Sequence, residues 1–274
     1  MSEVASTDKV GALYDRLTGM FATACGGNLH LGYWPDPSAA TPLGEASEQM
    51  TTQLIDKLGA TTGQHILDVG SGTGKPARRL ARETGATVWG VTLSKHQVNI
   101  ANAAARTEKL TDQVRFELAD AMRLPYEDNS FDGAWAIESL FHMPDREQAL
   151  REIARVLRPG GRLVIAEVAV CGEVDSNARE ILMQVYRLFE ITSLAHYDDF
   201  IPLVTKAGLT VSEQLDVSDY VRPTYRLLAE AMAAASHELP PGTGPSELAA
   251  LTGCVYACAE LPYTGYTFVV AVKP

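Results

Sequence analysis

The 274-residue sequence has few cysteines, a shortage of basic residues and no long hydrophobic run, and each lack excludes a class of protein. Four scattered cysteines with no histidine cluster beside them predict neither a disulfide framework nor a metal centre, so we expect no metal and free thiols. The 23 Lys and Arg against 34 Asp and Glu leave a net charge of −11, which disfavours binding to nucleic acid or to anionic membranes. No segment approaches the roughly 18 apolar residues of a transmembrane helix.

The amino-terminal 20 residues also lack the basic start and apolar stretch of a secretory signal, so we expect a cytoplasmic protein. The composition that remains, 46% hydrophobic and 21% charged, is typical of an ordinary globular chain. We expect a monomer or a homodimer whose partner is a small molecule.

From His65 onward, short apolar segments alternate with longer amphipathic ones. This alternation predicts an α/β fold with a parallel sheet built from right-handed βαβ units. The predicted strands are 65–69, 86–93, 114–118, 130–137, 162–168, 209–217 and 266–272, and the helices between them are 76–82, 94–108 and 146–157.

Helical segments flank this core on both sides. Residues 1–60 are expected to form a lid with helices at 14–24 and 41–58 and an aromatic loop at 28–34. Further helices are expected at 177–194, 198–207 and 223–237, with a Pro/Gly-rich connection at 238–246, and segments 171–197 and 222–262 are interpreted as cap insertions. The predicted organisation is therefore a lid (1–60), a core (61–170) and a remainder with the caps (171–274), all within one domain.

The strongest motif is the glycine-rich turn Asp68–Gly74, which follows a strand and precedes a helix. Glycines at 70, 72 and 74 allow backbone conformations and close approaches that a Cβ would block, and the next helix presents free N–H groups. Such a turn can hold a dinucleotide pyrophosphate or the amino-acid end of S-adenosylmethionine. The third glycine comes one residue too early for the dinucleotide pattern, and Asp68 would repel a pyrophosphate but can position an ammonium group.

At this point the sequence resembles the class I S-adenosylmethionine-dependent methyltransferases, from about residue 60 to 168 and again at the last strand. The segments 116–121, 124–132 and 157–163 are similar to the family's third strand, its approach to strand four and the turn before strand five. The resemblance implies a Rossmann-like seven-stranded, mostly parallel sheet with an antiparallel last strand, and S-adenosylmethionine as cofactor. It also implies that Asp120 and the backbone of Ala121 bind the adenine.

The second strand departs from the common family pattern, because it ends in residues 91–94 without a carboxylate for the ribose. A subgroup that includes cyclopropane and mycolic acid synthases is similar here, with Thr-Leu-Ser followed by a helical glutamine. That resemblance implies that Gln97, together with Thr92, binds the ribose. Gln97 also stands at the capping-box distance from Ser94, so an ordinary capping role is the alternative.

Two further segments, 28–34 and 138–145, resemble the rebeccamycin sugar 4′-O-methyltransferase and related natural-product enzymes. The resemblance implies that Tyr14 and Tyr33 close over the cofactor, that Glu138 belongs to its site and that His142 is the general base. The sequence differs where Phe141 replaces a second histidine and Glu167 replaces an aspartate.

Methyl transfer to a hydroxyl needs an aligned nucleophile and a group that removes its proton. His142 suits that task because an imidazole is largely neutral at cytoplasmic pH. Glu167, at the end of strand five, could orient His142, accept a proton itself or form an ion pair. We therefore expect O-methylation of a small natural product of secondary metabolism, with N- or C-methylation of an indole, alkaloid or amine as the alternative. A nicotinamide-dependent oxidoreductase and a catalytically silent cofactor-binding subunit are rivals from other classes.

Overall fold

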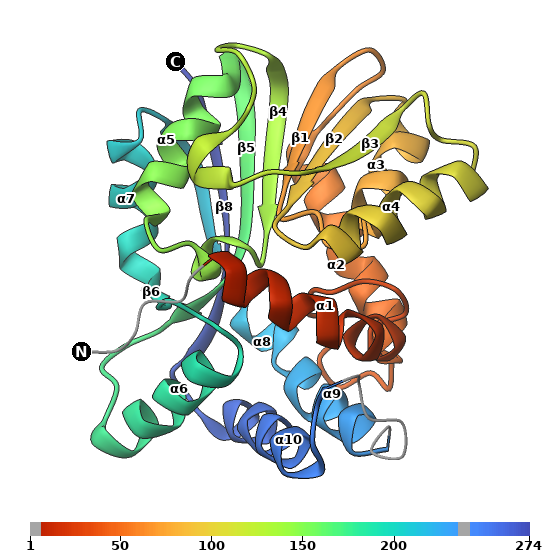
Figure 1. The fold of residues 1–274 in the computed structure, drawn as a ribbon. Coiled ribbons are helices and arrows are strands. Elements are labelled where there is room, and N and C mark those ends of the chain that lie inside the picture. Colours follow the sequence, from red (N-terminus) through yellow and green to blue (C-terminus); the bar gives the residue numbers. More distant parts are fainter. Residues whose placement is uncertain (1–6, 235–241) are drawn as a thin grey trace.

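The computed structural model describes residues 7–234 and 242–274, and its centre is an open, mostly parallel sheet with helices on both faces (Figure 1). The main path of the sheet runs in the order β3-β2-β1-β4-β5-β8-β7, and β8 is antiparallel to both of its neighbours. The strands are β1 (His65–Val69), β2 (Thr87–Thr92), β3 (Val114–Leu118), β4 (Phe131–Ile137), β5 (Leu157–Val170), β7 (Thr210–Asp216) and β8 (Thr264–Val272).

The predicted Rossmann-like α/β fold with an antiparallel last strand is thus confirmed. The described residues contain one more strand than the seven expected, the two-residue β6 (Ala195–His196), which pairs with the end of β5. Pairing of so short a strand depends on its place in the fold, and it leaves no alternating pattern in the sequence.

Helices cover both faces of the sheet. Successive side chains of a strand point to opposite faces, and most of those in the central strands are apolar, so both faces need a cover. In β1, Ile66 packs in the cluster on the side of α2, α3 and α4, whereas Leu67 and Val69 pack in the cluster on the side of α5 and α7. These helices are α2 (Leu43–Leu58), α3 (Lys75–Thr84), α4 (Lys95–Thr107), α5 (Arg146–Val156) and α7 (Phe200–Lys206). Short 3-10 turns are η1 (Ala121–Arg123), η2 (Leu140–His142) and η3 (Tyr197–Asp199).

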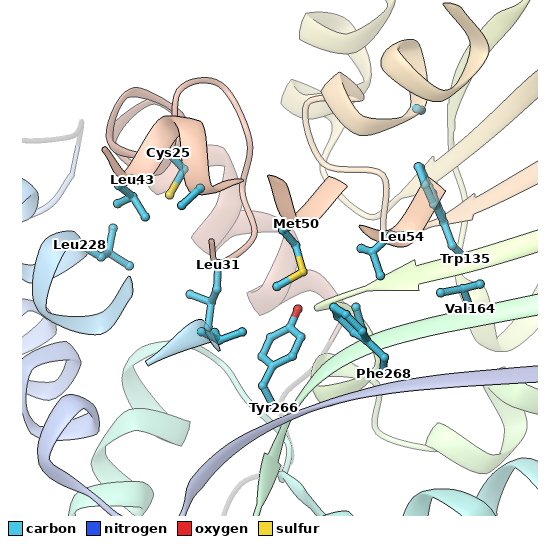
Figure 2. Close-up of a cluster of buried hydrophobic side chains, with 14 of the residues drawn as sticks. Cys25, Leu31, Leu43, Met50, Leu54, Trp135, Val164, Leu228, Tyr266 and Phe268 are labelled. Atoms are coloured by element: carbon cyan, nitrogen blue, oxygen red, sulfur yellow. The ribbon is translucent and has the colours of Figure 1, made fainter. Parts of the chain in front are cut away.

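Figure 2 shows how the first cluster continues from the sheet into the helices beyond its end. Met50 and Leu54 of α2 lie over Tyr266 and Phe268 of β8, and all four side chains are almost completely buried. This packing holds the amino-terminal part of β8 close to the segment that carries Leu31.

The remaining helices gather beyond the carboxyl ends of the parallel strands (Figure 1). They are α1 (Thr7–Ala24), α6 (Ser176–Leu188), α8 (Ser218–Val221), α9 (Pro223–Ala234) and α10 (Pro245–Glu260). The two predicted cap insertions correspond to α6 and to α9 with α10. Open α/β sheets bind ligands at this end, so the helices enclose the expected location of a site.

Three helix boundaries differ from the prediction by more than two residues, and the first is the start of α1, at Thr7 rather than at 14. Helix α6 ends at Leu188 rather than at 194, because Glu190 adopts a left-handed conformation with φ of 50° that stops the helix. Helix α10 begins at Pro245, inside the segment predicted as a connection, and the apolar run that follows lacks a clear helical stripe. Residues 235–237 of the predicted helix and 238–241 of the predicted connection lie outside the described residues.

Within the ranges that the structure describes, no helix combines the length and apolar character needed to cross a bilayer.

Candidate active site

Two adjoining cavities lie between the sheet and the helices beyond its carboxyl end. The first, which we call the turn cavity, holds about 980 Å³ including its mouth and is lined by the turn after β1 and the ends of β2 and β4. The second, the cap cavity, holds about 920 Å³ including its mouth and lies among α1, α6, α9 and α10.

The predicted glycine-rich turn forms one wall of the turn cavity. Gly70 and Gly72 have φ of 82° and 53°, a region that disfavours other residues. A Cβ on Gly70 would lie 2.3 Å from the Cβ of Ser139, and one on Gly72 would lie 2.9 Å from Leu29. Gly74 does not line the cavity; a Cβ there would lie 2.4 Å from the Phe116 ring, so its role is to let α3 pack against the sheet.

Two polar groups of the turn face this cavity without a full set of protein partners. The Ser71 hydroxyl is buried and has no hydrogen-bond partner among the described residues. Asp68 is 3% exposed, and burial raises the pKa of its carboxyl to about 7. A bare hydroxyl and a carboxylate that desolvation has destabilised are groups that a polar, cationic ligand would satisfy.

The other predicted cofactor residues surround the same cavity. Thr92 donates a hydrogen bond of 2.7 Å to the Gln97 side-chain oxygen, and the Gln97 amide donates to Thr18 of α1 at 3.1 Å. The backbone N–H of Gln97 donates to the Ser94 hydroxyl, which caps α4. Gln97 therefore takes part in the predicted helix cap and also lines the cavity. Asp120 and Ala121 line the opposite side.

The cap cavity is predominantly apolar. Its walls come from four helices, the loop after α1 and the ends of β5 and β8. The apolar lining residues are Phe21, Cys25, Leu29, Leu31, Phe141, Val168, Leu182, Val185, Phe189, Ile191, Leu194, Leu228, Val255 and Cys258, and the polar ones are Tyr14, His30, Glu138, His142, Tyr225 and Thr264. No Lys or Arg occurs among these described lining residues.

The two cavities meet at a junction, which we define as the five residues that line both: Tyr14, Leu29, His30, Glu138 and His142. These residues come from α1, the loop after it and the segment after β4. The sequence prediction included Tyr14, Glu138 and His142, and the structure brings these three together. A group passed from one cavity to the other must cross between these side chains.

His142 is held at the junction in one protonation form. Its Nδ1 lies 3.0 Å from the Glu190 carbonyl oxygen, which only accepts, so Nδ1 carries the hydrogen. The Nε2 lone pair therefore accepts the Tyr14 hydroxyl hydrogen at 2.8 Å. Burial lowers the pKa of His142 to about 4, so the imidazole is neutral at physiological pH and its Nε2 carries a lone pair rather than a proton. The left-handed backbone that ends α6 at Glu190 thus also orients this histidine.

Glu138 is a second titratable group at the junction. It is the first residue after β4 and has a φ of 48°, a conformation that costs energy for a residue with a Cβ. Its Oε1 accepts hydrogen bonds from the Leu31 N–H and the Tyr266 hydroxyl, both at 2.8 Å. Burial raises the pKa of its carboxyl to about 7. The strained backbone and the two bonds direct the side chain between the cavities and anchor the loop from α1.

In the structure, Glu167 binds the backbone of the turn that carries His142. Its Oε2 accepts from the Leu140 N–H at 2.8 Å and the Phe141 N–H at 3.3 Å, and it lines neither cavity. No hydrogen bond joins it to His142 among the described residues. It holds η2, the turn that carries His142, from beneath the site, and burial raises the pKa of its carboxyl to about 8.

Tyr33, which the resemblance places over the cofactor, also lies outside both cavities in the structure. Its ring stacks on Tyr220 with centroids 5.1 Å apart and lies 6.2 Å from Phe268, and it lines neither cavity. The chain turns after Leu31, and the side chains that face the cavities from this loop are Leu29 and His30 instead. Alternation of direction in an irregular loop cannot be read from sequence.

Sequence reasoning also missed two lining residues of the cap cavity, Tyr225 and Thr264. Tyr225 lies in the predicted helix 223–237, where an aromatic side chain suits core packing equally well. Thr264 lies just ahead of the predicted final strand, in the stretch that the structure adds to β8.

Comparison with known proteins agrees with this geometry. The family model described as a methyltransferase domain matches residues 67–165, which include the glycine-rich turn and the segment after β4. The methyltransferase GfsG of Streptomyces halstedii is 46% identical over 98% of this chain and 96% of its own length. The 27-O-demethylrifamycin SV methyltransferase of Amycolatopsis mediterranei is 36% identical over 97% of both chains.

A solved structure, that of the [4+2]-cyclase SpnF, covers 99% of this chain and 98% of its own, with a TM-score of 0.86 and 33% identity. The chain belongs to the class I S-adenosylmethionine-dependent methyltransferases. S-adenosylmethionine is its cofactor, and the bare Ser71 hydroxyl and the cradle that a Cβ at Gly70 or Gly72 would fill are consistent with that ligand.

Proposed function

We propose that the chain methylates a hydroxyl group of a largely apolar natural product, with the cofactor in the turn cavity and the acceptor in the cap cavity. The observation that carries this proposal is the junction, where a neutral histidine with an unprotonated Nε2 lies between the two spaces. The names of the relatives above support transfer to a small molecule of secondary metabolism.

Different residues of the turn cavity bind different parts of the cofactor. Asp68 pairs with the ammonium group, and the N–H groups and glycines of the turn approach the amino-acid end. Thr92 and Gln97 bind the ribose, and Asp120 with the Ala121 backbone binds the adenine. When bound, S-adenosylmethionine would supply a methyl group on a positively charged sulfur. The acceptor oxygen bonds to the methyl carbon in line with the carbon–sulfur bond, which breaks and leaves S-adenosylhomocysteine.

His142 removes the proton of the acceptor hydroxyl through Nε2 as the oxygen–methyl bond forms. Its Nδ1–H bond to Glu190 keeps the ring oriented during this transfer. Leu29, His30 and the buried α1 side chains around them exclude water, which would otherwise compete as nucleophile. Because His142 lies on the side of an apolar cavity without a described cation, a neutral acceptor fits better than a phosphorylated one.

The reaction itself is tested by incubating the protein with methyl-deuterated cofactor and a panel of polyketide and terpenoid alcohols. Mass spectrometry should detect an ether that has gained the labelled methyl group. Labelling only on nitrogen or carbon of amine and indole compounds would favour the alternative acceptors. A ring-forming reaction without labelling would favour an activity such as the SpnF name indicates.

Tyr14 occupies the Nε2 lone pair that the acceptor needs, so we propose that the acceptor hydroxyl replaces the tyrosine hydroxyl. Tyr14→Phe is then expected to keep kcat within about tenfold while the free energy of unfolding falls by about 1 kcal/mol, the net value of one hydrogen bond. Steady-state kinetics and urea unfolding measure the two effects. If kcat falls as far as in a His142 variant, the tyrosine hydroxyl itself carries the proton.

Glu167 is a positioning residue in this account, since it holds the backbone of η2 rather than a ligand. Glu167→Gln retains an oxygen that accepts from the Leu140 N–H and should keep kcat near that of the parent. Glu167→Leu should lower kcat by about 10–100-fold through misplacement of His142, with unchanged affinity for S-adenosylhomocysteine. Equal loss in both variants would show that the carboxyl group acts in the chemistry.

A further inference from the structure

Two residues that line the cap cavity carry buried hydroxyl groups that nothing in the described protein binds. The side chains of Tyr225 and Thr264 line the cavity and are only 9% and 6% exposed. Neither hydroxyl oxygen has a hydrogen-bond partner in residues 7–234 and 242–274. They come from α9 and from the first residue of β8, so two elements distant in sequence bring hydroxyls to one cavity.

Other polar groups of the same walls are already bound. The Tyr14 hydroxyl donates to His142, and both ring nitrogens of His30 contact protein oxygens, of Leu31 at 2.9 Å and of Thr51 at 3.1 Å. Burying a hydroxyl without a partner costs free energy that a phenylalanine or a valine would avoid at the same position. Two such hydroxyls in an otherwise apolar wall therefore point to a ligand that binds them.

We infer that Tyr225 and Thr264 bind an oxygen of the acceptor other than the one that is methylated. The acceptor is then a neutral, mainly apolar molecule with at least two oxygen functions, a hydroxyl at His142 and a carbonyl or second hydroxyl deeper in the cap cavity. An anionic group does not suit this place, because the described walls offer it no Lys or Arg. This inference rests on the proposed function, since it assigns the cap cavity to the acceptor.

The experiment compares two kinds of probe, dodecan-1-ol and a series of 12-carbon hydroxyketones whose carbonyl moves along the chain. Binding to protein saturated with S-adenosylhomocysteine is measured by calorimetry for the parent, Tyr225→Phe and Thr264→Val. Tyr220→Phe and Thr23→Val are the matched controls, because both residues are exposed and line neither cavity.

At least one hydroxyketone should bind the parent more tightly than dodecan-1-ol, and each test variant should weaken that binding about tenfold. Binding of dodecan-1-ol should stay within about twofold, and the melting temperature of the variants should be unchanged or higher, because an unsatisfied hydroxyl has been removed. A lower melting temperature with equal loss for both probes would show a structural role and overturn the inference. So would the failure of every hydroxyketone to bind better than the alcohol.

Methyl transfer to the same probes separates this inference from the proposed function. If the hydroxyketone binds through the two hydroxyls but the parent forms no methyl ether with any probe, the proposed function fails and the oxygen subsite remains. If methyl ethers form and the variants treat both probes alike, the proposed function stands and the subsite is refuted.

Discussion

Replacing His142 with glutamine should lower kcat for O-methylation by about 10²–10⁴-fold, the range that general-base catalysis supplies. Glutamine keeps a polar side chain of similar reach but has no group that takes a proton at neutral pH. The Nε2 of His142 lies at the junction of the two cavities, and the other histidine there, His30, has both ring nitrogens bound to the oxygens of Leu31 and Thr51.

Single-turnover measurements with saturating cofactor report this chemical step directly. Affinity for S-adenosylhomocysteine should change by less than about threefold, because the proposed cofactor contacts lie elsewhere in the turn cavity. His96→Gln is the control, since His96 is exposed on α4. A loss below tenfold in the His142 variant would mean that the acceptor needs no base, as for methylation of a neutral amine.

Replacing Asp68 with asparagine should weaken binding of S-adenosylmethionine and S-adenosylhomocysteine by about 10–100-fold, the usual value of a hydrogen bond to a charged group. The two side chains have the same shape, so the buried turn should keep its geometry while it loses the charge that pairs with the ammonium group. Calorimetry measures the effect, and Asp56→Asn on the exposed side of α2 is the control. Unchanged affinity would remove the ammonium contact from the account.

The same carboxyl group should make cofactor binding depend on pH. Burial raises the pKa of Asp68 to about 7 in the free protein, so below that pH the group is mostly protonated and must release its proton to pair with the ammonium. Affinity for S-adenosylhomocysteine should therefore rise as pH increases through about 7 and level off above it, and Asp68→Asn should lose that part of the dependence. The raised pKa also makes the free protein lose stability as pH rises from about 4 to about 7, because over that range the folded state gives up a proton that the unfolded state has already lost. Calorimetry in buffers of different ionisation enthalpy counts the proton released.

The sequence was sufficient for seven strands of the described sheet because most of them are short apolar runs bounded by turn residues, whereas the two-residue β6 leaves no such run. Gly70 and Gly72 were predictable for the same local reason, since their positive φ values require glycine. Gly74 has a positive φ of 70° as well, but its lack of a Cβ also makes room for the Phe116 ring, a contact between distant segments that no local pattern records.

The side chains at the junction depended on contacts that no local pattern records. Tyr33 was assigned to the site from a resemblance and Glu167 from its place at the end of strand five. Stacking on Tyr220 turns the first away, and two backbone N–H groups hold the second beneath η2. His142 was predicted, but its protonation form follows from the Glu190 carbonyl, which lies 48 residues away in the chain. Tertiary hydrogen bonds thus decide which polar residues meet the ligands.

In the proposed function, the methyl group crosses from the turn cavity to the cap cavity between Tyr14, Glu138 and His142. The roles of the other site residues depend on that path. A crystal structure with bound S-adenosylhomocysteine tests it most directly. We predict the amino-acid end at Asp68 and Gly70, and the sulfur facing His142 across the junction. A sulfur directed away from the cap cavity, or an amino-acid end outside the glycine-rich turn, would contradict the account.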